Sequence, residues 1–136
     1  MAINKEIVHD SDTHILVKTH ADAGGANSFY RMSDFAGGVN NTSSVAIERI
    51  EYSLFPDNAS GSSERLTITF SNASSPTSAS DHIVLYRLFG QGEIGQPGMR
   101  VSEDMVASTQ NCVRFVFEGN CQGTVLVLLR KISGFS

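Results

Sequence analysis

The chain is poor in charged residues, cysteine and proline, and it contains no tryptophan. Charged residues make up 18% of its 136 residues, whereas about a quarter is usual in globular domains. Its ten lysines and arginines are scattered singly, apart from Arg130 and Lys131. Because phosphate backbones are bound by basic patches or stripes, we expect no nucleic-acid partner.

Long apolar runs are also missing. A membrane-spanning helix needs about 20 consecutive apolar residues, and no run in this chain approaches that length. Residues 1–6 lead into polar sequence without the apolar segment of a signal peptide. We therefore expect a protein that is made in the cytoplasm and has no membrane partner.

Only two cysteines are present. The pattern places Cys112 at the start of a strand and Cys121 in the exposed turn after it, about nine residues away along an extended chain. A disulfide requires Cα atoms within about 7 Å of each other. We expect two free thiols, and a core that needs no cross-link because a chain of this length buries enough apolar surface.

In place of these residues the chain is rich in Ser, Thr, Asn and Gly, and short segments alternate between apolar and polar residues. Alternation with a period of two is typical of half-buried β-strands. No crossover helix separates the segments, which favours antiparallel pairing. The prediction is an all-β fold: a single domain, residues 1–136, built as an antiparallel two-sheet β-sandwich, jelly-roll-like, with a closed barrel as the alternative. About eight strands are expected, at residues 5–9, 13–20, 28–32, 45–54, 65–70, 82–89, 112–118 and 124–132.

Two strand segments carry local predictions. Residues 112–118 and 124–132 flank a glycine-bracketed turn, which is the pattern of a β-hairpin. In residues 45–54 the alternation slips, and a β-bulge at Glu48-Arg49 restores one buried face. A helix is the competing interpretation of that segment, but its β-branched content favours the bulged strand.

The segments between the strands are predicted to contain little helix. One helical turn at most is expected at residues 33–36, and a single short helix at residues 103–110. Residues 71–81 are a low-complexity Ser/Ala/Thr/Pro loop, and residues 89–101 are irregular and glycine-rich.

Candidate motifs for cofactors and metals are weak. Residues 90–95 match G-x-G-x-x-G, but Gln96-Pro97-Gly98 follows and does not continue a helix, so a glycine-rich loop at a sheet edge is favoured over a dinucleotide site. His9, Asp10, Asp12 and His14 are metal-ligand types that converge only if they meet across a turn. With no closed ligand set, we expect no metal and no cofactor.

Catalytic groupings are equally weak. For nucleophilic catalysis, Cys121 has no neighbouring base in the sequence and no G-x-S-x-G elbow is present. For glycoside hydrolysis, Glu48 and Glu51 are candidate acids, but nothing in the sequence indicates that they flank a cleft. We therefore assign no catalytic residue and expect a protein that is not an enzyme.

The order of strands resembles a group of small all-β virion proteins of tailed bacteriophages. The resemblance rests on the strand at 45–54, the strand at 66–70, the glycine-ended strand at 88–92 and the terminal segments 113–117 and 124–131. It implies a structural component of the virus particle, and in particular a capsid decoration or cement protein that stabilises the head shell. The loops at 71–81 and 89–101 depart from the pattern.

The resemblance also implies partners. They are the major capsid protein or other virion proteins, together with further copies of this chain in a homo-oligomer such as a trimer. Residues 1–12 are the candidate for an extended N-terminal arm that reaches a neighbouring subunit. Two alternatives stay open: a glycan- or receptor-binding module of a tail fibre or adhesin, and a metal-dependent cupin-like enzyme.

Overall fold

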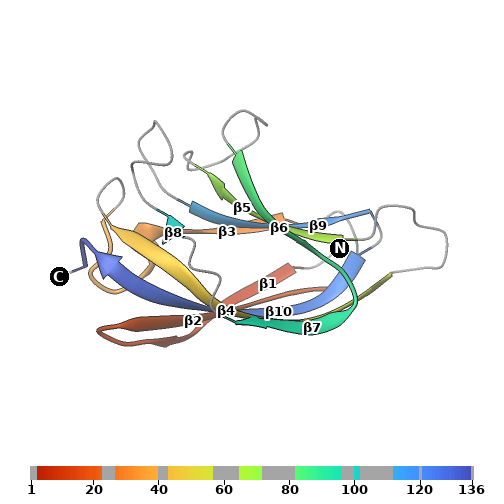
Figure 1. The fold of residues 1–136 in the computed structure, drawn as a ribbon, viewed down its shortest axis with the longest axis horizontal. Helices are drawn as coiled ribbons and strands as arrows, with labels where there is room; N and C mark the ends of the chain where they lie inside the picture. The colour runs from red at the N-terminus through yellow and green to blue at the C-terminus, as the bar shows by residue number, and fades with distance from the viewer. Residues whose placement is uncertain are drawn as a thin grey trace.

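The computed structural model describes residues 3–22, 27–39, 43–56, 65–71, 82–95, 100–101, 112–119 and 121–135. These residues form two antiparallel sheets that pack face to face as a sandwich (Figure 1), which confirms the predicted fold class. The larger sheet has the order β1 (Ile3–Asp10), β2 (His14–Ala21), β10 (Cys121–Ser133), β4 (Ser44–Pro56) and β7 (Gln91–Gly95), and β8 (Arg100–Val101) also pairs with β4. The smaller sheet has the order β3 (Asn27–Arg31), β9 (Cys112–Glu118), β5 (Arg65–Ser71) and β6 (His82–Leu88).

The core lies between the inner faces of the two sheets. Alternate residues of β10 and β9 point into it, so that Val127 and Phe115 are fully buried while Leu128 and Val116 are only half-buried. Tyr30 packs edge-on against Phe115, with ring centroids 5.7 Å apart, and its hydroxyl donates to the Lys18 carbonyl at 2.9 Å. The largest fully buried side chains are Tyr30, Phe70, Phe115, Phe117, Ile15, Met32, Ile47, Ile50, Leu66, Ile68, Leu129 and Val17.

The predicted bulge in β4 is confirmed. Arg49 pairs with Leu128 and Ile47 pairs with Leu129, so Glu48 is the extra residue on the β4 side. The bulge lets both Ile47 and Ile50 point into the core, although they lie three positions apart and strict alternation would put them on opposite faces. The helical interpretation of this segment is excluded.

The predicted hairpin is wrong. β9 pairs with β3 and β5 in the smaller sheet, whereas β10 pairs with β2 and β4 in the larger one, so the chain changes sheet between Glu118 and Cys121. Gly119 has a φ of 64°, a left-handed conformation that glycine adopts without strain. Both strands bury alternate side chains, and alternation alone does not say which sheet a strand joins.

The segment predicted to be irregular at residues 89–101 contains two strands instead. Gln91–Gly95 is β7 and Arg100–Val101 is β8, and both pair with β4. The G-x-G-x-x-G match therefore falls largely within an edge strand. A 3-10 helix at Met32–Asp34 accounts for the helical turn expected at residues 33–36; it begins one residue earlier and ends two residues earlier. The helix predicted at residues 103–110 lies outside the described residues.

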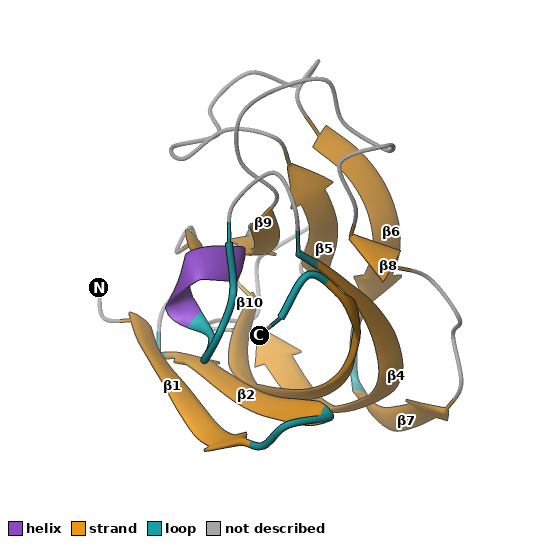
Figure 2. Ribbon diagram, turned by 90° about the vertical axis from the view of Figure 1, so that its left-hand side faces the viewer, coloured by secondary structure: helices purple, strands orange, loops and turns teal. Residues whose placement is uncertain are grey.

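The proposed N-terminal arm contributes β1 to the chain's own larger sheet. β1 pairs with β2 along Ile3–Asp10, with a bulge at Val8 between the Ile7–Val17 and His9–Leu16 pairs. Figure 2 shows β1 at the outer edge of that sheet, beside β2. Among the described residues, no strand pairs with the other edge of β1.

Candidate functional site

A row of polar side chains crosses the outer face of the larger sheet. The registers of neighbouring strands place one residue of each strand opposite the next, and the alternation of each strand turns these residues away from the core. We call this set the polar row; it consists of Asn4, His20, Thr124, Ser53 and Gln91.

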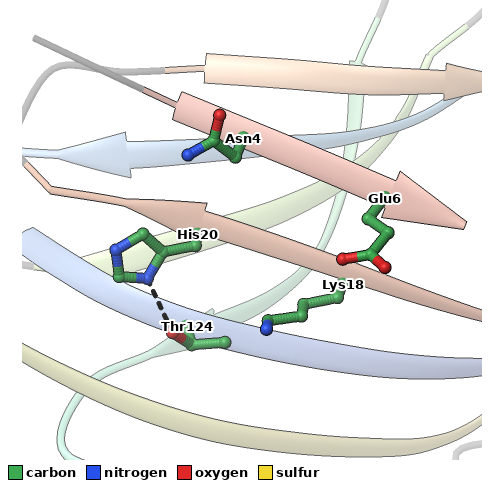
Figure 3. Close-up of a pocket in the computed structure, with 5 residues that line it drawn as sticks. All are labelled: Asn4, Glu6, Lys18, His20 and Thr124. Carbon is green, nitrogen blue, oxygen red and sulfur yellow. Dashed lines mark hydrogen bonds between the residues drawn. The ribbon is translucent and has the colours of Figure 1, made fainter. Parts of the chain in front are cut away.

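A hollow of about 560 Å³ lies at the β1 end of the polar row (Figure 3), and Asn4, Glu6, Lys18, His20 and Thr124 line it. We call it the polar hollow. His20 Nδ1 lies 2.7 Å from Thr124 Oγ1, and this hydrogen bond holds the imidazole against β10. Figure 3 shows the side chains of β1, β2 and β10 side by side on one face, so a carboxamide, a carboxylate, an ammonium, an imidazole and a hydroxyl converge.

The polar hollow contains two charged side chains that are available to bind a ligand. The carboxylate of Glu6 and the ammonium of Lys18 make no ion pair with another side chain within the described residues. Their strands place them directly opposite each other. The hollow therefore combines one negative and one positive group with uncharged donors and acceptors.

The charges elsewhere on this face are paired within the chain. Arg49 contacts Glu93 and lies 3.5 Å from Glu51. Glu48, on the bulge, lies 2.9 Å from Arg130 and 3.5 Å from the His14 ring. Between these groups lies an apolar strip of three half-buried leucines: Leu16, Leu126 and Leu128.

A second hollow continues from the polar hollow across the sheet. Both hollows share Thr124, and the second is also lined by Leu126 and by residues of β4 and β7: Glu51, Tyr52, Ser53 and Gly92. The Tyr52 side chain packs against the core, and its hydroxyl would lie 2.7 Å from a Cβ at position 92, so glycine leaves room for the ring there. The two hollows therefore adjoin at Thr124, one on the β1 side and one on the β7 side of β10.

On the outer face of the smaller sheet, Glu118 is the most strongly held acid. Burial alone would raise the pKa of its carboxyl group, but hydrogen bonds from Thr67 and Arg65 outweigh that effect and lower it. The Arg65 Nε atom lies 3.3 Å from the carboxylate. This acid is therefore ionised and internally satisfied.

The candidate metal ligands have other partners. Asp10 pairs with Lys131 at 2.8 Å and accepts a hydrogen bond from the Ala36 amide at 2.7 Å. His14 lies beside Glu48, and His9 and Asp12 are exposed. Within the described residues, no group of three or more His, Cys, Asp and Glu side chains lies close enough together to hold a metal ion.

Both cysteines are free thiols, as expected, and both are buried. The expectation that Cys121 is exposed in a turn is wrong, because β10 begins at Cys121 and turns its side chain into the core. Burial raises the pKa of the Cys112 thiol to about 11, from an ordinary value of 9.0.

The Cys112 thiol should therefore react slowly. In a Cys121→Ala variant at pH 8, we expect labelling by Ellman's reagent to be at least about 100-fold slower in the folded protein than in guanidinium, because the thiolate fraction is lower by that factor. Since the folded pKa lies above the unfolded value, this thiol supports stability fully below pH 9, and that support is lost as the pH rises from 9 to about 11. Equal labelling rates in the two states would contradict the burial of Cys112.

Sequence reasoning did not assemble the polar hollow. Its candidate sites include none of the residues that line the hollow: Asn4, Glu6, Lys18, His20 and Thr124. Alternation indicates that each of these residues points outward from its strand. Only the sheet order brings them together, because it places β10 beside β2.

The fold and the polar hollow define an all-β sandwich with a polar depression on its larger sheet. No protein-family model matches the chain, and no curated protein matches it. In the part of the chain that the structure describes, no helix has the length and apolar character needed to cross a membrane.

Proposed function

We propose that this chain is a non-enzymatic structural protein of a bacteriophage particle. Its role in this proposal is to decorate the head and stabilise the shell by binding the major capsid protein. The proposal that the particle is a bacteriophage is based on the resemblance in strand order. The observation that carries the proposal is the open, exposed edge of β1.

β1 has the properties of a strand that binds a partner. Residues 4–9 are all exposed, and Ile7 and Val8 are 38% and 47% exposed although both are apolar. An edge strand offers unpaired amide and carbonyl groups to an extended segment of another protein. Each added main-chain hydrogen bond contributes about 1 kcal/mol net, and the apolar pair adds area to bury.

The lysine of β1 does not block this edge. Lys5 turns across the gap between the sheets, where its Nζ donates to the Phe29 carbonyl at 2.7 Å and lies 5.2 Å from the centre of the Tyr30 ring. A charge on an edge strand usually prevents pairing, but here it is directed to the neighbouring sheet. A hollow of about 310 Å³ beside Ile7, also lined by Tyr30 and Asp34, would accept a side chain of the partner.

Repetition would make such a contact effective. A head shell presents many copies of one subunit, and a homo-oligomer of this chain, with a trimer as the proposed form, would engage several of them at once. Weak individual contacts then give tight overall binding. Light scattering of the free chain measures its molar mass, and comparison with the 14.7 kDa of one chain gives the number of copies in the oligomer.

The test is co-sedimentation of the purified chain with heads of the phage that encodes it, prepared without this protein. The natural chain should pellet with the heads, and a Val8→Asp variant should bind at least about tenfold more weakly, because a charge in the contact is costly to desolvate. Val39→Asp is the matched control, since Val39 is 51% exposed and lies outside β1. A natural chain that stays in the supernatant, or equal binding by the Val8→Asp variant, would refute the proposal.

A further inference from the structure

We infer that the polar hollow is a sugar site, and that it takes a neutral pyranose unit at the end of a glycan. The inference does not rest on the proposed role at the phage head. The hollow lies on the outer face of the larger sheet, whereas the proposed head contact is the free edge of β1.

The first argument is the kind of hydrogen-bonding groups in the hollow. A sugar presents hydroxyl groups that both donate and accept, and it is best met by groups that do the same. The Asn4 carboxamide, the His20 imidazole and the Thr124 hydroxyl each have donor and acceptor capacity. Directly opposite side chains on neighbouring strands stand about 5 Å apart, so two of them can reach different, non-adjacent hydroxyls of one pyranose ring.

The second argument is the charge. Glu6 adds a carboxylate that accepts from adjacent hydroxyls, and Lys18 adds an ammonium that donates to ring or hydroxyl oxygens. Arg49 and Arg130, by contrast, are already occupied by glutamates of the same face. The opposite charges of Glu6 and Lys18 cancel, and the carboxylate repels an anion, so a phosphate or a nucleotide is disfavoured relative to a neutral sugar.

The third argument is the shape of the site. The polar hollow, at about 560 Å³, falls within the range of about 300–1,000 Å³ that is usual for ligand sites. The adjoining hollow shares Thr124 and is also lined by Leu126 and Ser53, so it offers an apolar surface to the C–H face of a second sugar and a hydroxyl to its oxygens. Two adjoining hollows suit a chain of sugars that crosses the strands from β1 toward β7.

The experiment is a titration of the ¹⁵N-labelled full chain, followed by amide NMR shifts, with glucose, galactose, mannose and N-acetylglucosamine. At least one sugar, at concentrations up to about 50 mM, should shift the amides of Asn4, Glu6, Lys18, His20 and Thr124 with a millimolar dissociation constant. Inorganic phosphate is titrated in parallel as the charged competitor.

Two variants locate the binding. Thr124→Val removes the hydroxyl that holds His20 and should weaken binding about tenfold, the effect expected from one hydrogen bond. Thr13→Val is the matched control: Thr13 Oγ1 lies 2.9 Å from His14 Nδ1, so the same kind of Thr–His pair is lost outside the hollow. The amide spectrum of each variant shows whether it is folded.

Three outcomes would overturn the inference: no shift in the hollow with any of the four sugars, equal weakening by both threonine variants, or shifts with phosphate alone. Because this titration uses the free chain, its failure leaves the head-binding proposal standing. Failure of the co-sedimentation likewise leaves the sugar site standing.

Discussion

A Gly123→Ala variant should lose about 3 kcal/mol of stability, because position 123 has no room for a side chain. Gly123 lies in β10 with a φ of 133°, a backbone conformation that side-chain-bearing residues rarely adopt. A Cβ at this position would also lie 2.1 Å from the Ser53 carbonyl oxygen of β4. Strands β10 and β4 would have to separate at the centre of the larger sheet. For a chain of this size, the melting temperature should fall by about 12 °C.

Gly95→Ala is the matched control for this prediction. Gly95 lies in β7, which pairs with the same strand β4, and a Cβ there meets nothing within 4 Å. Its effect on the free energy of unfolding should stay within about 0.5 kcal/mol. Thermal melts of both variants followed by circular dichroism are sufficient, and equal losses for the two glycines would contradict the structure.

The second large effect is expected from Phe115→Ala. Phe115 lies at the centre of β9, is fully buried and packs against Tyr30 from the neighbouring strand. Truncation removes the apolar transfer energy and leaves a cavity that the surrounding sheets fill only in part, so a loss of about 4 kcal/mol is expected. Urea denaturation measures this loss of stability: the midpoint urea concentration should fall while the slope of the free energy of unfolding against urea concentration stays constant.

Val116→Ala is the comparison, because Val116 is the next residue along β9 and points to the outer face, where it is half-buried. Its loss should stay below about 1 kcal/mol. If the two variants lost similar stability, the assignment of inner and outer faces of β9 would be wrong.

Local alternation was sufficient to predict eight of the ten strands among the described residues, and one irregularity within them. The slip of phase between Ile47 and Ile50 appears only if one residue is extra, and the structure places that residue at Glu48. The strand at Gln91–Gly95 was missed because Gly92 and Gly95 supply no side chains to alternate. Its formation depends on β4, which provides the hydrogen-bonding partner from a distant part of the sequence.

Strand partners were not predictable in the same way. Residues 112–118 and 124–132 have the pattern and the intervening glycines of a hairpin, yet they join different sheets. The polar hollow was unpredictable for the same reason. His20 and Thr124 are 104 residues apart in the sequence, and only the pairing of β2 with β10 places them in hydrogen-bonding contact.

The position of β10 determines the order in which the larger sheet becomes complete. β2 and β4 are not neighbours in that sheet; each pairs with β10, which follows all the other strands in the sequence. Because a ribosome delivers the chain from its amino end at about 5–20 residues per second, β2 and β4 emerge before the strand that joins them. The nascent polypeptide therefore presents two open strand edges until residues 121–133 leave the exit tunnel, and during that interval each edge is a template for pairing with another chain on the same polysome.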